Sequence, residues 1–265
     1  MSQWTAIAGR ITLFPASTVQ PFPSALELYK RIWESDPVNF QGATSPLAPS
    51  IAQGSRTGLA VTCTLHPSRI DFNFTQAAPE DSSGSRRLLV IENTQALHDE
   101  LARVGSLIAE GLVTNPILRV ATFLHLVSIE ANIVEANKAL MSIVPLQYRI
   151  KLRDEEEFVF QISRPHLSEQ VPGVKMNYIN KWSVDRFQMV SLMFSMGGSA
   201  PISPPTGAAP VLSEFITAGI TFDNNNVPVG PDKPLSSAQQ SSLILESLAQ
   251  TAISMKEVGL NLDGF

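Results

Sequence analysis

The chain has 265 residues, of which 44% are hydrophobic, so it is long enough to bury a substantial core. Its net charge of -5 disfavours nucleic acid as the main partner, because phosphate binding draws on an excess of Lys and Arg. The single cysteine, Cys63, excludes an intramolecular disulfide framework and suits a reducing compartment.

The first elements along the chain are a strand, a helix and a loop. Alternating apolar and polar side chains predict a strand over residues 6–14. Ser24 and Glu27 have capping-box spacing, and they begin a helix that we expect to end near Glu34. Residues 41–58 are rich in Ser, Pro, Gly and Ala, which is typical of a long surface loop.

The clearest alternation in the chain lies on either side of Pro67. Residues 59–65 and 70–75 each place apolar side chains on one face only, which predicts a β-hairpin. A short strand is expected over residues 88–91. An amphipathic helix then closes this part of the chain, with Gly111 as its C-terminal stop.

The same order of elements is predicted again in the second half. Apolar residues on both faces of residues 118–126 indicate a central strand, and Ser128 can cap the helix that follows it. Further strands are expected at 148–152, 158–162, 174–182, 186–194 and 215–222. Residues 197–210 are predicted to form a loop. Ser236 and Gln239 form another capping-box spacing at the start of the last helix.

We therefore predict an α+β fold made of two related β-α-β(n)-α halves, residues 1–115 and 116–265, in one compact unit. The halves would form a mainly antiparallel sheet with helices packed on one face. Similar patterns in the two closing helices favour an internal duplication. This arrangement resembles, in topology, the duplicated saddle of the TATA-box-binding protein class. No residue motif of that family is present, so the resemblance implies no functional residues.

No catalytic, cofactor or metal site is predicted from the motifs. The four histidines are too far apart in sequence for a metal-ligand pair: His66, His98, His125 and His166. His125 is expected to lie partly buried on a strand with a shifted pKa. Asp223 and the three asparagines that follow it do not match a calcium loop, and we expect a turn there.

The region between Arg149 and Arg186 was weighed as a nucleic-acid interface, because it contains seven Lys and Arg residues. It also contains six Asp and Glu residues, so its net charge of +1 is too small for an electrostatic footprint. A solvated sheet face with ion pairs is the better interpretation.

Three residues in this region are candidates for binding a partner. Tyr178 and Trp182 fall on one face of a predicted strand, with Lys181 between them. Tyr and Trp are enriched at binding hot spots, so these residues could anchor a partner if that face is exposed. The alternative is that the two rings belong to the core.

The leading hypothesis is a non-enzymatic binding or assembly protein that acts through protein partners or self-association. A nucleic-acid-binding saddle is the first alternative, and an enzyme whose site shows no local motif is the second. No apolar stretch reaches about 18 residues, and no basic region with an apolar run opens the chain. We therefore expect no membrane span and a cytoplasmic location.

Overall fold

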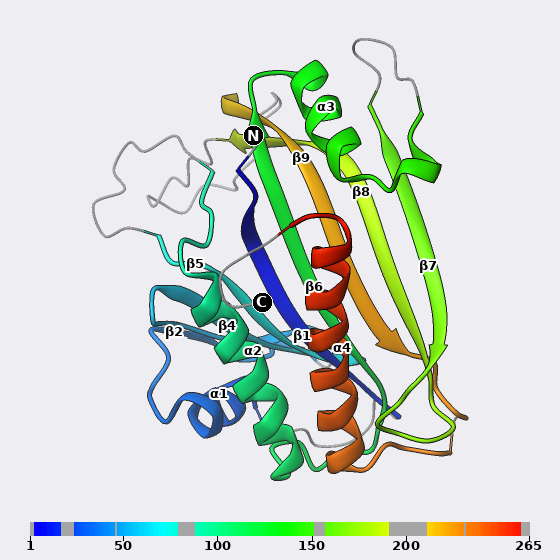
Figure 1. Cartoon of the computed structure of the whole chain (residues 1–265). Coiled ribbons are helices and arrows are strands. Elements are labelled where there is room, and N and C mark those ends of the chain that lie inside the picture. The colour runs from blue at the N-terminus through cyan, green and yellow to red at the C-terminus, as the bar shows by residue number, and fades with distance from the viewer. Residues whose placement is uncertain are drawn as a thin grey trace, which may run out of the picture.

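The computed structural model describes residues 3–16, 24–45, 47–78, 88–150, 157–190, 211–230 and 232–260. These residues form an α+β fold with one open, nine-stranded antiparallel sheet and four α-helices (Figure 1). The first half contains β1 (Thr5–Pro15), α1 (Ala25–Trp33), β2 (Asn39–Gln41), β3 (Ser50–Arg56), β4 (Leu59–His66), β5 (Arg69–Gln76) and α2 (Thr94–Ala109). The second half contains β6 (Ile117–Glu130), α3 (Ile133–Ile143), the 3-10 helix η1 (Leu146–Tyr148), β7 (Val159–Leu167), β8 (Lys175–Val190), β9 (Val211–Asn226) and α4 (Ser237–Glu257).

The strand order is β2-β3-β4-β5-β1-β6-β9-β8-β7, and every neighbouring pair is antiparallel. The first strands of the two halves, β1 and β6, pair with each other at the centre. On its other side, each contacts the last strand of its own half, β5 or β9. The predicted antiparallel sheet is confirmed. The common origin of the halves and the domain boundary at residue 115 remain predictions.

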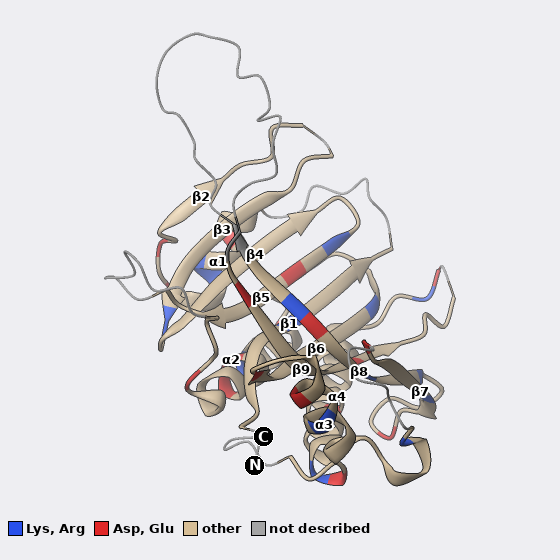
Figure 2. Ribbon diagram, turned by 90° about the horizontal axis from the view of Figure 1, so that it is seen from above, with Lys and Arg blue, Asp and Glu red and all other residues tan. Residues whose placement is uncertain are grey.

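The helices pack on one face of this sheet, as Figures 1 and 2 show from two directions. Helix α1 contacts β3 and β4, α2 contacts β1, α3 contacts β6, β8 and β9, and α4 contacts β6 and β9. Helices α2 and α4 also pack against each other, which joins the two halves on this side. No helix in the described ranges is both long and apolar enough to cross a membrane.

Both predicted capping boxes are confirmed. The backbone N–H of Ser24 donates to the Glu27 carboxylate at 2.6 Å, and the Glu27 N–H donates back to the Ser24 hydroxyl at 3.2 Å. Ser236 and Gln239 make the same two contacts at the start of α4. Each box satisfies two of the backbone donors that a helix leaves unpaired at its N-terminus.

The core lies between the helices and the sheet. Its centre is formed by strand residues that alternate as predicted, with Val61, Cys63, Phe72 and Phe74 almost fully buried. Burying a phenylalanine side chain of this kind stabilises the fold by roughly 1.5–3 kcal/mol relative to leaving it in water. The hairpin predicted around Pro67 is therefore the part of the sequence that most directly specifies the sheet.

The prediction of a loop over residues 41–58 is wrong for residues 50–56, because they form β3. The segment lacks apolar alternation because its helix-facing positions hold small residues, which leave room for α1. A Cβ atom on Gly54 would clash with the Tyr29 hydroxyl of that helix. Small residues are therefore needed there for close packing, and they hide the strand from a hydrophobicity pattern.

Four other expectations need correction in the second half. Ser128 lies within β6, and Asn132 caps α3 in its place. Residues 148–150 are not a strand, because the chain turns through η1 after Pro145, whose ring restricts its own backbone. The two strands expected over 174–182 and 186–194 are not separate, because residues 175–190 form one continuous strand, β8. The turn expected at the asparagines is the end of β9, where Asn224 donates to the Ser247 carbonyl at 3.0 Å. The loop predicted at 197–210 lies outside the described residues.

Candidate functional site on the helix-free face

The sheet face that carries no helix is the candidate functional surface, and Figure 2 shows charged residues of both signs along its strands. Side chains alternate across a strand, so the pairings of Ile11 with Phe72 and Thr122 fix which residues face the helices. We call the opposite side the open face. Its members are Thr62, Thr64, His66, Arg69, Asp71, Asn73, Ala8, Arg10, Thr12, Phe14, Arg119, Ala121, Phe123, His125, Gly219, Thr221, Asp223, Asn225, Lys175, Asn177, Ile179, Lys181, Ser183 and Asp185.

Two arginines at the centre of the open face lie over aromatic rings of the neighbouring strand. The guanidinium of Arg10 on β1 is 4.9 Å from the centre of the Phe123 ring on β6. The guanidinium of Arg119 on β6 is 4.8 Å from the centre of the Phe14 ring on β1. The two pairs lie on either side of Thr12. In the first pair β1 provides the arginine and β6 the ring, and in the second pair these roles are reversed. Cation–π contacts of this kind hold each guanidinium in place without neutralising it.

Both arginines keep unused hydrogen-bonding capacity. The Nε atoms of Arg10 and Arg119 are buried and have no hydrogen-bond partner among the described residues. Within the described part of the chain, neither guanidinium forms a hydrogen bond or an ion pair. Because a guanidinium has five N–H donors and no acceptor, its terminal nitrogens can still bind carboxylate or carbonyl oxygens. The rings fix the orientation of these donors.

The open face also carries buried negative charge. Asp71 is almost fully buried, and it accepts hydrogen bonds from the Thr12 hydroxyl at 2.7 Å and from Arg69 at 2.8 Å. Asp223 accepts a hydrogen bond from the Asn225 amide at 3.3 Å. As defined above, the open face contains five Lys and Arg residues and three Asp residues. It is therefore a mixed-charge surface and not a basic one.

A second polar cluster of the open face surrounds His125. Its Nε2 atom lies 3.8 Å from the Asp185 carboxylate, and the Ser183 hydroxyl donates to the same carboxylate at 2.8 Å. Both the histidine and the aspartate lie over Gly219. A Cβ atom there would come within 2.7 Å of Asp185 and 3.0 Å of His125, so only glycine leaves space for this pair.

The electrostatics of His125 follow from its partial burial, as predicted. Burial lowers the pKa of His125, because it disfavours the charged imidazolium. Asp185 opposes this effect, while the positive charge of Lys181 adds to it. At neutral pH the ring is therefore uncharged, and its buried Nε2 atom has no hydrogen-bond partner in the described structure.

This cluster does not have the geometry of a catalytic triad. The Ser183 hydroxyl donates to Asp185 and not to His125, so no base is placed to activate the serine. Cys63 is buried on the opposite, helix-covered face, and burial raises the pKa of its thiol. Among the residues described, no group of three or more His, Cys, Asp and Glu side chains could hold a metal ion.

The structure separates the three residues predicted to bind a partner. Tyr178 and Trp182 face the helices and are only 7% and 1% exposed. The Tyr178 hydroxyl donates to Glu246 of α4 at 3.3 Å, and the Trp182 ring lies 5.6 Å from the Phe160 ring. Lys181 faces the other way and belongs to the open face. Their joint role in partner binding remains a prediction, and the two rings occupy the core position that was the alternative.

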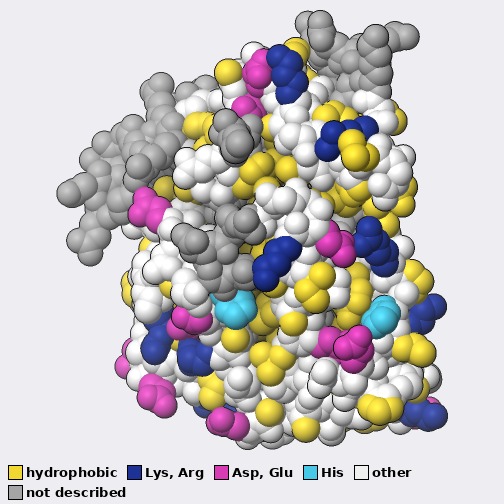
Figure 3. Space-filling view, viewed as in Figure 1, with side chains coloured by type: hydrophobic (Ala, Val, Ile, Leu, Met, Phe, Trp, Pro, Cys, Tyr) yellow, Lys and Arg dark blue, Asp and Glu magenta, His cyan; other side chains and the backbone are white. Residues whose placement is uncertain are grey.

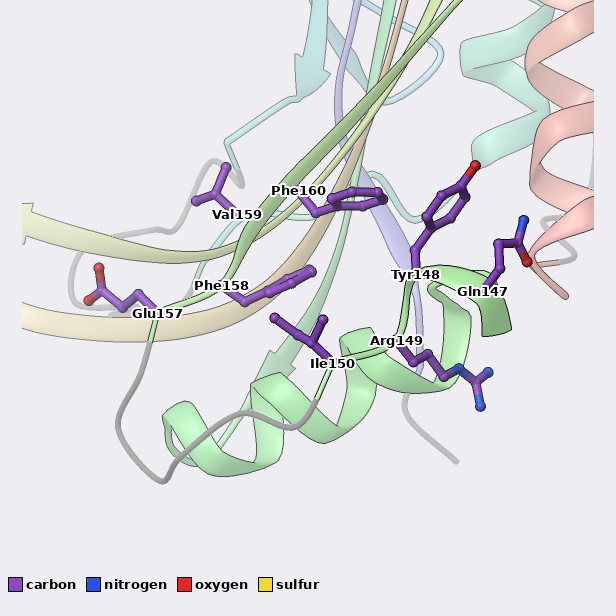
Figure 4. A pocket seen from close by; sticks show the side chains of 8 residues that line it. All are labelled: Gln147, Tyr148, Arg149, Ile150, Glu157, Phe158, Val159 and Phe160. Carbon is purple, nitrogen blue, oxygen red and sulfur yellow. The ribbon is translucent and has the colours of Figure 1, made fainter.

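The helix side has a hollow of about 680 Å³ near η1 and the start of β7. Figure 4 shows that Tyr148, Ile150, Phe158 and Phe160 point toward one another around it. Elsewhere on this side, charged side chains of both signs are scattered among apolar and uncharged groups (Figure 3). No single-sign field on this side suggests a polyanionic ligand.

Comparison with protein-family models and with curated proteins finds no match to this chain.

The sequence analysis missed the two arginine–phenylalanine pairs. A signal for them was present, because both central strands contain an arginine followed by a phenylalanine four residues later, Arg10 and Phe14 in β1, and Arg119 and Phe123 in β6. On a strand this spacing places both side chains on one face. That the pairs form across the two strands, however, depends on their register.

Proposed function

We propose that this chain is a non-enzymatic binding protein that engages a protein partner through the open face. The observation that carries the proposal is the pair of ring-backed guanidiniums, Arg10 on Phe123 and Arg119 on Phe14, whose terminal nitrogens are unpaired within the described residues. Arginine and aromatic residues are the types most enriched at protein interfaces.

The geometry also suggests the chemistry of the partner. Arg119 lies opposite Phe14, which is four residues along β1 from Arg10, so the backbone positions of the two arginines lie roughly 13 Å apart along the strands. A partner that presents two carboxylate or carbonyl groups at this separation, with apolar atoms between them, would satisfy both arginines. The adjacent Thr12 and Ala121 are small enough to let it approach the sheet.

The two alternatives lack a supporting observation of this kind. A nucleic-acid-binding saddle would need a strongly basic open face, and five cations against three aspartates do not provide one. An enzyme would need a nucleophile or base within reach of a bound substrate. The contacts of His125 and Ser183 do not place them in those roles.

Affinity capture with quantitative mass spectrometry tests the proposal. The double variant Arg10→Ala/Arg119→Ala removes both guanidiniums from the open face. The matched control, Lys30→Ala/Lys256→Ala, removes two exposed cations from the ends of α1 and α4, on the helix side. Both variants have the same net charge, so a general electrostatic effect would reduce partner binding by both of them equally.

We expect the wild-type chain and the control to retain a protein that the double arginine variant loses by about tenfold or more. Equal retention by all three forms would contradict the proposal. Recovery of nuclease-sensitive material in place of a protein would favour the nucleic-acid alternative and also contradict it. Circular dichroism spectra of the variants check that the fold is intact.

A further inference from the structure

Strand β7 forms one edge of the sheet, and in the described structure no strand pairs with its outer side. The corresponding strand of the first half, β3, does not lie at the edge of the sheet. It pairs with β4 as β7 pairs with β8, and it is covered by the short strand β2. An uncovered edge presents a row of free backbone N–H and C=O groups that can accept another strand.

The backbone of β7 identifies which groups point outward. The carbonyl of Phe158 accepts from Val184 on β8 at 3.0 Å, and the N–H of Ser168 donates to the Val174 carbonyl at 2.8 Å. The even-numbered residues therefore bond inward, and the odd-numbered residues bond outward. Pro165, which has no N–H, falls in the outward set, where a proline is tolerated.

Exposed apolar side chains lie beside this edge. Leu146, Ile150 and Val159 are 76%, 55% and 64% exposed. Ile150 points into the hollow shown in Figure 4 together with Tyr148, Phe158 and Phe160, whereas Val159 points away from it. The apolar patch and the unpaired edge are thus adjacent, and one occupant can cover both.

We propose that the occupant is a second copy of this chain, whose β7 pairs antiparallel with β7 about a two-fold axis at Gln161. In this register the two Gln161 residues exchange their outward backbone hydrogen bonds. Val159 lies opposite Ser163 of the second copy. On the helix side, each Phe160 lies opposite Ile162 of the other copy, and both are only partly buried in the single chain.

The self-complementarity of this register supports the choice of a second copy. Its two charged residues from 157 to 165 are Glu157 and Arg164, which would lie opposite Pro165 and Phe158 of the other copy. No like charges meet, and on the helix side Phe160 meets Ile162 of the other copy. A two-fold interface requires such matching, because each residue is used on both sides of the axis. The inference is independent of the open face.

Charge substitution at the axis tests the proposal. Gln161 is exposed, so Gln161→Lys and Gln161→Glu should each fold, but each places two like charges directly opposite one another. By sedimentation velocity analytical ultracentrifugation, we expect a concentration-dependent dimer for the wild type and a dissociation constant at least about tenfold higher for either variant. An equimolar mixture of the two variants should restore the dimer. Gln41→Lys, on the other edge strand, is the matched control and should dimerise like the wild type.

A cysteine at the axis provides a second measurement. Residues that face each other in this way have Cα atoms about 5.5 Å apart, which suits a disulfide. Gln161→Cys should therefore form a covalent dimer on mild oxidation, whereas the native Cys63 is buried. A wild-type chain that stays monomeric up to about 100 μM, or a dimer unaffected by both charge variants, would overturn the proposal.

Discussion

The two faces of the central strands share one backbone but differ in how their polar groups are satisfied. On the helix-covered face, the buried carboxylate of Glu100 accepts hydrogen bonds from Trp33 at 3.1 Å, Arg56 at 3.2 Å and Arg103 at 2.6 Å. On the open face, Arg10 and Arg119 rest on aromatic rings with no such partner in the described chain.

This difference separates the residues that hold the fold together from those that remain able to bind. A buried charge is tolerated only when several partners compensate its loss of hydration, as they do for Glu100. An arginine on a ring keeps its charge and its terminal N–H donors, so it can still bind another molecule. Substitutions on the covered face should therefore change stability, and those on the open face should mainly change binding.

The largest expected effect is the difference in stability between phenylalanine substitutions on the two faces. Phe72→Ala should lower the free energy of unfolding by about 3–5 kcal/mol, because it leaves a cavity in the core. Phe123→Ala, on the half-buried open face, should cost only about 1 kcal/mol. Urea denaturation of both variants measures the difference. Equal losses would show that the open face is as tightly packed as the core.

The next effect concerns Glu100. Glu100→Gln keeps the size of the side chain but removes its charge, so Arg56 and Arg103 lose their anion. We expect a loss of about 2 kcal/mol, the range for hydrogen bonds to charged groups. Glu92→Gln, the same change at an exposed site, is the control and should alter stability by less than about 0.5 kcal/mol. A neutral result for Glu100→Gln would mean that the buried network is dispensable.

A smaller effect concerns pH and His125. Its pKa is lowered in the folded chain, so the unfolded chain binds more protons as the pH falls below about 6.5. Stability contributed by the neutral ring is complete above that value and is lost as the pH falls toward the folded-state pKa. His125→Gln should reduce the difference in urea midpoint between pH 7.5 and pH 5.5. An unchanged difference would show that His125 does not contribute to it.

The smallest expected effect on stability is that of the open-face arginines. Arg10→Ala and Arg119→Ala should each cost about 0.5–1 kcal/mol, the value of a partly exposed cation–π contact. Thermal unfolding followed by circular dichroism measures this loss. A cost above about 2 kcal/mol for either variant would place these arginines among the residues that support the fold, and would remove the contrast between the two faces.

Local patterns predicted the elements that depend on neighbouring residues. The capping boxes at Ser24 and Ser236 and the alternation from residue 59 to 75 all involve residues close in sequence, and all are confirmed. Strand β3 was missed because Gly54 must stay small to leave room for Tyr29, which lies on helix α1. The size of a neighbouring side chain in the fold is not readable from a hydrophobicity pattern.

The candidate site was harder to predict than the fold. Arg10 lies on Phe123 only because β1 and β6 pair in one particular register, and a shift of β1 by one residue would turn Arg10 to the helix face. Tyr178 and Trp182 share one strand face, but a shared strand face does not reveal which side the helices cover. Side-chain spacing is a local property, whereas exposure is set by tertiary packing.

The position of β1 between β5 and β6 also bears on how the chain is assembled. Thr12 lies beside Asp71 on one side and beside Ala121 on the other, so the N-terminal strand connects the two halves of the sheet. During synthesis this strand emerges first, yet its second edge stays unpaired until β6 has been made. Pairings between such distant residues close slowly. Until β6 has been made, one edge of β1 therefore lacks a partner strand, and unpaired edges of this kind favour aggregation.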